Sequence, residues 1–169
     1  YHLQRGLAKK ELGQVEAAVV DLENSLALLP TAPAHYALGD IAKARGNLTD
    51  AIQHYKVVAK SGGEYGQAAT GELVRLELPT NPGAYVNRAC SADGNGNLIV
   101  TVRNETSVQI MGVQVAVQYN DAAGRQQQKR FNIVGQLPPG KVASVNTELG
   151  PYSAGSGCPV QVVAAEVAE

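Results

Sequence analysis

Apolar residues follow a helical spacing in the first part of the chain and alternate with polar residues in the second part. The helical spacing predicts five helices, at residues 1–13, 15–29, 34–45, 49–60 and 65–78. The alternation predicts six short strands, at residues 85–90, 98–103, 113–119, 127–133, 141–149 and 160–167. Two prolines and a glycine within residues 79–83 predict a boundary between the two parts, because these residues end a helix and begin a new segment.

The helical part contains an internal repeat built on small residues. Four positions recur after 33 residues: Gly6, Gly13, Ala18 and Leu22 correspond to Gly39, Gly46, Ala51 and Tyr55. A fixed period of about 33–34 residues is typical of stacked helical hairpins, and small residues allow two helix backbones to approach closely. We therefore expect two hairpins side by side, with residues 65–78 as a capping helix and with Pro30 and Pro33 in the connection between hairpins.

The second part is expected to form a small antiparallel β-sandwich of immunoglobulin-like type. Turns are predicted between the strands, and Gly112 inside a strand pattern predicts a bulge. The fold class is therefore α+β as two segregated domains, an all-α array of helical hairpins and then an all-β sandwich. The predicted boundaries are 1–78 for the repeats with their cap, 79–83 for the linker and 84–169 for the sandwich.

The helical part resembles a tetratricopeptide repeat array. The residues that carry this resemblance are Gly6, Gly13, Ala18 and Pro30 in one copy and Leu38, Gly39, Gly46, Ala51 and Tyr55 in the next. The pattern departs from the family at the start of each repeat, where His2 and His35 replace an aromatic residue. It also departs at the end of the second copy, where Gly63 replaces a proline.

The whole chain resembles the C-terminal tail of bacterial zinc metallopeptidases, on the segments ENSLALLPTAPAHYALGDIA, LVRLELPTNPGAYV and QLPPGKVASVNTELGPY. In that family a catalytic domain with an HExxH motif precedes a tetratricopeptide tail. The resemblance implies a periplasmic or cell-envelope location and an accessory role in docking substrate proteins. This sequence contains no HExxH motif, so the peptidase activity itself is not implied for it.

The repeat register predicts a binding groove along the first helix of each hairpin. The predicted groove residues are Leu3, Leu7, Lys10, Tyr36, Asp40, Lys43, Glu72 and Arg75. A groove with an aromatic anchor and paired charges can hold a peptide or protein segment. The alternative is that Leu3 and Leu7 pack against a preceding helix and that the charges form a solvated surface.

The two cysteines, Cys90 and Cys158, lie near the first and last predicted strands. They can form a disulfide in an oxidising compartment or remain two separate buried thiols. With His2, His35 and His54 they do not make a zinc site, because the ligands are scattered over both parts of the chain. We interpret the histidines as structural or surface residues, and the DGNGN segment at 93–97 as a hairpin turn rather than a calcium loop.

Charge and composition narrow the classes of partner. The formal net charge of −1 gives no long-range attraction to nucleic acid or to anionic lipid, and no stretch of about 18 apolar residues is present. We expect a non-enzymatic interaction module that needs no metal or cofactor. Two alternatives stay open: an assembly module that pairs through the edge strand at 126–131, and a hydrolase with a site between the domains, for which no Ser/His/acid set is evident.

Overall fold

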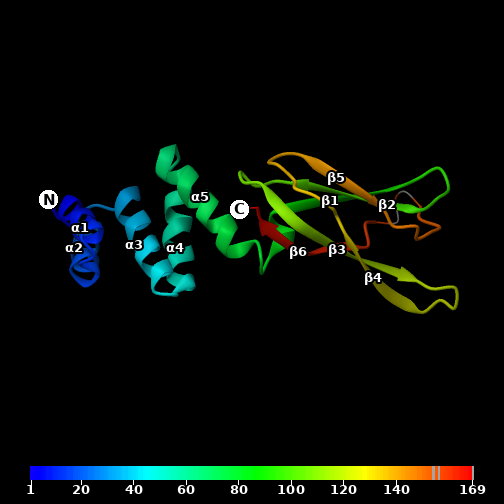
Figure 1. Cartoon of the computed structure of the whole chain (residues 1–169), viewed down its shortest axis with the longest axis horizontal. Helices are drawn as coiled ribbons and strands as arrows, with labels where there is room; N and C mark the ends of the chain where they lie inside the picture. The colour runs from blue at the N-terminus through cyan, green and yellow to red at the C-terminus, as the bar shows by residue number, and fades with distance from the viewer. Residues whose placement is uncertain (154, 156, 169) are drawn as a thin grey trace. The chain divides into compact units, whose positions relative to one another are not determined.

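Helices precede strands along the chain, and the protein is of mixed α+β composition. The computed structural model describes residues 1–153, 155 and 157–168. The chain divides into two compact units, Tyr1–Leu76 and Glu77–Glu169, coloured blue to green and green to red in Figure 1. Each unit is described by itself below.

The first unit consists of helices that follow one another in chain order (Figure 1). Their bounds are α1 His2–Glu11, α2 Val15–Leu28, α3 Ala32–Ala44, α4 Leu48–Ala59 and α5 Gly63–Glu77. Within the part of the chain that the structure describes, none of the helices is long and apolar enough to cross a membrane.

The helical hairpins pack at a glycine, at the same place in both repeats. A Cβ atom added at Gly6 would lie 2.9 Å from Leu22 Cγ, and one added at Gly39 would lie 2.8 Å from Tyr55 Cε1. Both distances are too short for real side chains, so only glycine lets the two helices meet at this separation. The 33-residue interval found in the sequence therefore corresponds to a repeated contact in space.

Glycine also ends the first helix of each hairpin. Gly13 and Gly46 have φ angles of 71° and 77°, in the left-handed region that favours glycine at the end of a helix. After Gly46 the side chain of Asn47 accepts a hydrogen bond from Asp50 N at 3.3 Å and caps α4.

The start of α3 differs from the prediction. This helix begins at Ala32 and has a proline in its first turn, so the prediction that Pro33 lies in the connection is wrong. A proline is tolerated there because the first N–H groups of a helix have no partner within the helix.

The second unit contains two three-stranded antiparallel sheets, with the strand orders β1-β2-β5 and β4-β3-β6. Their strands are β1 Val86–Ala92, β2 Leu98–Asn104, β3 Ile110–Asn120, β4 Gln126–Asn132, β5 Val142–Asn146 and β6 Val160–Val167. A short 3₁₀ helix at Pro82–Ala84 precedes β1. The β5 strand is shorter than predicted, because Glu148 has a positive φ of 57° and leaves the extended conformation.

The alternation of apolar and polar residues along the strands matches an alternation of buried and exposed side chains. In β2 the buried positions are Leu98, Val100, Val102 and Asn104, and the residues between them are partly or fully exposed. The register of β3 against β6 shifts between Met111 and Gln114, with Gly112 at a φ of 61°, which confirms the predicted bulge. Buried aliphatic side chains from both sheets fill the core of this unit, whereas Phe131 is only partly buried.

The two cysteines are joined in a disulfide between Cys90 of β1 and Cys158, which precedes β6. The DGNGN segment forms the turn between β1 and β2. There the Asp93 carboxylate accepts hydrogen bonds from Asn95 N, Asn97 N and Asn146 Nδ2 at 2.8 Å each. The side-chain amide of Asn97 also donates to this carboxylate, at 3.0 Å, and this bond, followed by those named above, holds the pKa of Asp93 at about 2. The Asp93 carboxylate therefore stabilises the turn in which it lies.

Candidate functional site

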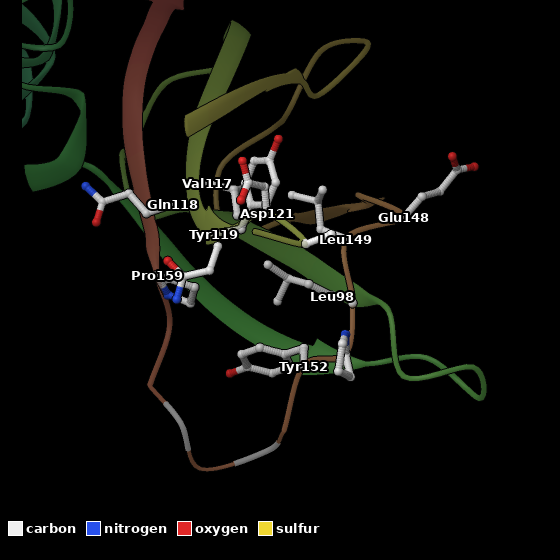
Figure 2. A pocket seen from close by; sticks show the side chains of 13 residues that line it. Leu98, Val117, Gln118, Tyr119, Asp121, Glu148, Leu149, Tyr152 and Pro159 are labelled. Atoms are coloured by element: carbon white, nitrogen blue, oxygen red, sulfur yellow. The ribbon is translucent and has the colours of Figure 1, made fainter. Parts of the chain in front are cut away.

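The β unit contains a hollow of about 590 Å³ at the ends of β2 and β3. Figure 2 shows Leu98, Leu149 and the ring of Tyr152 around it, with Glu148 directed away. Two of its polar groups bind within the surrounding loops: the Tyr152 hydroxyl donates to Gly157 O at 2.7 Å, and the Asp121 carboxylate accepts from Arg125 N at 2.9 Å. The bond from Arg125 N is the main cause that lowers the pKa of Asp121. The Tyr152 hydroxyl and the Asp121 carboxylate are therefore already engaged within the protein.

The predicted groove residues of the helical unit are joined by ion pairs between successive first helices. Lys10 Nζ of α1 lies 2.6 Å from Asp40 Oδ2 of α3. Lys43 Nζ of α3 lies 2.6 Å from Glu72 Oε2 of α5, which is also 3.3 Å, through Oε1, from Arg75. The structure thus brings these five residues together as two bridges, from α1 to α3 and from α3 to α5.

Asp40 has a second role below the surface. Its Oδ1 atom accepts the hydroxyl proton of Tyr55 at 2.8 Å, and Tyr55 is fully buried. Burial, followed by the bond to Asp40, raises the pKa of Tyr55, so this hydroxyl remains a donor. Asp40 therefore links three helices, α1, α3 and α4.

Tyr36 is the aromatic residue of the predicted groove, and it packs between two other tyrosines. Its ring centroid lies 5.5 Å from that of Tyr55 and 5.6 Å from that of Tyr65. Burial is the main cause that raises the pKa of Tyr36. Tyr65 remains 40% exposed, so the edge of this aromatic cluster is open to solvent.

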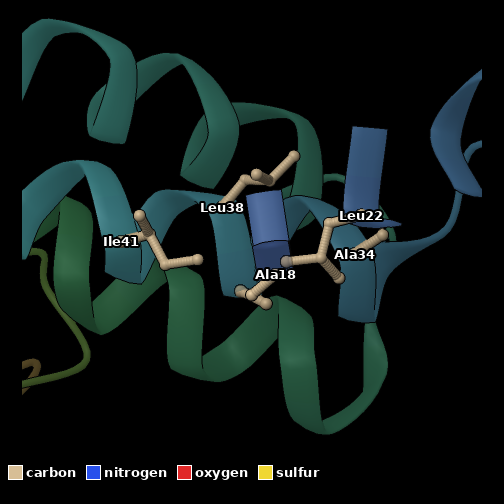
Figure 3. Packing of buried hydrophobic residues seen from close by; sticks show 6 residues of the cluster. Ala18, Leu22, Ala34, Leu38 and Ile41 are labelled. Carbon is tan, nitrogen blue, oxygen red and sulfur yellow. The ribbon is translucent and has the colours of Figure 1, made fainter. Parts of the chain in front are cut away.

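Leu3 and Leu7 have a different environment from the other predicted groove residues. Both are partly buried and pack against the core cluster between α2 and α3. Figure 3 shows that cluster, with Ala18 and Leu22 of α2 against Ala34, Leu38 and Ile41 of α3. These two leucines therefore contribute mainly to the packing of α1 on its neighbours.

A smaller hollow of about 380 Å³ lies beside the Lys10–Asp40 pair. Val15, Ile41 and Ala44 form its apolar wall, and the Arg45–Glu16 pair, 2.9 Å between Arg45 Nη2 and Glu16 Oε1, lies at its other side. The volume suits one or two medium-sized side chains of a peptide. Sequence reasoning missed this hollow, since Val15 and Glu16 belong to the second helix of the first hairpin, whereas the groove was predicted on first helices alone.

Among residues 1–153, 155 and 157–168, no three His, Cys, Asp or Glu side chains are placed together so as to hold a metal ion. The groups beside the smaller hollow are charged pairs and aliphatic side chains, which can bind and orient a polypeptide.

Comparisons with family models, with curated proteins and with solved structures gave no significant match for this chain.

Proposed function

We propose that this chain is a non-catalytic protein-interaction module in which helical repeats of the tetratricopeptide type bind a peptide or protein segment. The binding surface is the smaller hollow together with the ion pairs along α1, α3 and α5. The β unit is an immunoglobulin-like sandwich in this proposal, with the disulfide as a covalent link within it.

The smaller hollow is the observation that carries the proposal. Its apolar wall of Val15, Ile41 and Ala44 offers contact to an aliphatic side chain, and the flanking ion pairs offer hydrogen-bond partners to the peptide backbone on either side. The charged side chains are already held in place by one another, so little side-chain entropy is lost when a ligand binds.

The test uses a substitution that fills the hollow without touching the core. Ala44 is exposed at the end of α3 and lines the hollow, so Ala44→Leu adds volume there, and leucine is a good helix former. Peptides selected from a random library on the wild-type chain are expected to carry an aliphatic residue and to bind Ala44→Leu at least about tenfold more weakly.

Ala8→Leu is the matched control, because Ala8 is an exposed alanine of α1 that does not line the hollow. Equal affinity of the peptides for the wild type, Ala8→Leu and Ala44→Leu would refute the proposal. Asp40 is a poor probe of binding, since its replacement also removes the acceptor of the buried Tyr55 hydroxyl.

By resemblance, we propose that the module is the accessory C-terminal region of a cell-envelope zinc metallopeptidase, with periplasmic location. The Cys90–Cys158 disulfide supports an oxidising compartment. The complete reading frame tests this proposal: an HExxH motif upstream, behind a secretory signal, is expected, and a frame without that motif would contradict it.

A second candidate function is assembly through the edge strand β4. This strand pairs with β3 on one side and is the last strand of its sheet, and six of its seven residues are exposed. A free edge of this kind can pair with a second copy of the chain. If assembly is the function, sedimentation equilibrium will show a dimer that dissociates in Gln126→Lys/Gln128→Lys, whereas a monomeric wild type excludes it.

A further inference from the structure

Two histidine side chains meet between the helices of the second hairpin. His35 of α3 and His54 of α4 place their Nδ1 atoms 3.0 Å apart, with ring centroids separated by 5.3 Å. This is the distance of a direct N–H···N hydrogen bond, in which one neutral ring donates its Nδ1 proton and the other accepts it. Both side chains are only partly exposed. The contact therefore depends on the protonation state of both rings.

The first hairpin has a different pair of residues at the same two positions. His2 and Asp21 precede His35 and His54 by 33 residues (35−2 and 54−21), and there His2 Nδ1 lies 3.3 Å from Asp21 Oδ1. A proton added to His2 increases the attraction between this ring and the carboxylate, since opposite charges at this distance favour the charged forms. Acid therefore acts in opposite directions on the two equivalent contacts.

We propose that His35 and His54 form a pH-sensitive contact, which holds α3 against α4 at neutral pH and weakens when the medium becomes acidic. One added proton still leaves an N–H group on one ring and a lone pair on the other. A second proton puts an N–H group on both facing nitrogen atoms and gives both rings a positive charge, so the hydrogen bond is lost and the rings repel each other.

The surroundings of the two rings oppose their protonation. Burial is the main cause that lowers the pKa of both His35 and His54, and the neighbouring His35 ring lowers the pKa of His54 further. Two carboxylates raise the pKa of His54 in the opposite direction, Asp50 of α4 and Glu23 of α2, but the net shift is downward. The unfolded chain takes up protons at these rings near pH 6.5. The stability that the pair contributes is therefore present above that pH and is lost as the pH falls through the lowered pKa values.

The ionic cluster of the first hairpin is not affected in the same pH range. Asp21 is 1% exposed and is bonded to Lys9 Nζ at 2.8 Å and to Arg5 Nε at 2.7 Å. Bonds from Arg5, the largest cause, and from Lys9 hold the pKa of Asp21 well below its usual range, so this carboxylate stays ionised at pH 5.0. Of the two equivalent contacts, only the one in the second hairpin is weakened by mild acid.

Helix α3 connects this contact to the smaller hollow. Ile41 and Ala44, which line that hollow, belong to the same helix as His35. A weaker contact between α3 and α4 is then expected to weaken peptide binding at acid pH, a consequence that rests on the proposed function. The melting temperature of the chain without peptide tests the contact itself.

Far-ultraviolet circular dichroism of the full chain during heating, at pH 7.5 and at pH 5.0, is the experiment. The helical transition of the wild type is expected to lie roughly 5–11 °C lower at pH 5.0, the shift that a tenfold loss in the folding equilibrium produces in a unit of this size. In His35→Gln/His54→Gln neither side chain titrates, so this decrease should nearly vanish. His2→Gln is the matched control at the equivalent repeat position and should keep at least the decrease of the wild type.

His54→Asp gives the second hairpin the residue pair of the first. A proton on His35 then strengthens the contact, because the ring faces a carboxylate, so this variant is expected to melt at a higher temperature at pH 5.0 than at pH 7.5. A wild type that melts equally at both pH values would overturn the proposal. So would an undiminished decrease in the double glutamine variant or in His54→Asp. If His54→Asp does not fold, the double glutamine variant decides the test.

Discussion

Replacing Cys90 and Cys158 together with serine is expected to destabilise the β unit by about 4 kcal/mol. The disulfide closes a loop with a sequence separation of 68 residues, and a loop of this length restricts the unfolded chain by about that amount. For a unit of this size, the melting temperature falls by roughly 15–30 °C. Hydrogen exchange of amides in β2 and β3 reports this loss for the β unit alone.

Reduction of the wild-type protein is the control for the cysteine substitutions. Dithiothreitol should shift the melting of the wild type to that of the double serine variant and leave the variant unchanged. If the variant melts like the non-reduced wild type, then the disulfide contributes no stability. The disulfide would then no longer support the proposal that the protein works in an oxidising compartment.

Ala51→Arg is expected to unfold the helical unit. Ala51 is 0% exposed and belongs to the core cluster with Tyr55, Val58, Ala69 and Leu73. An arginine there overfills the space between helices and buries a charge without a partner, at a cost of roughly 3–5 kcal/mol or more. A unit of 76 residues has a total stability of roughly 4–11 kcal/mol, so a cost of this size removes a large share of that stability or all of it.

Gln53→Arg is the matched control, because it adds the same side chain at an exposed position of the same helix. Far-ultraviolet circular dichroism during heating should show a wild-type transition for Gln53→Arg and a lost or strongly lowered transition for Ala51→Arg. Coincident melting curves for the two variants would contradict the packing of the repeats.

The positions that sequence reasoning predicted best are those fixed by backbone geometry. Gly6 and Gly39 could be aligned because only glycine fits the helix contact, and Gly13 and Gly46 because a left-handed residue ends each helix. The bulge at Gly112 follows from the same kind of constraint. Helix starts were less certain, as Pro33 shows, because proline is equally suited to a connection and to a first helical turn.

The contacts of side chains far apart in the sequence were harder to predict. The Lys10–Asp40 and Lys43–Glu72 pairs span 30 and 29 residues, and which carboxylate each lysine reaches depends on how the helices are rotated and crossed. The His35–His54 contact was missed as well. Its signal was present, since His2 to Asp21 and His35 to His54 both span 19 residues and occupy equivalent repeat positions.

The central claim is that a polypeptide binds the helical unit beside the Lys10–Asp40 pair. Amide chemical shifts of the ¹⁵N-labelled chain, recorded during titration with a library-selected peptide, test it most directly. The account predicts that the largest shifts fall at residues around Val15, Ile41 and Ala44, which line the smaller hollow, and that Ala44→Leu abolishes them at the same peptide concentration. Largest shifts within residues 77–169, or unchanged shifts in Ala44→Leu, would contradict it.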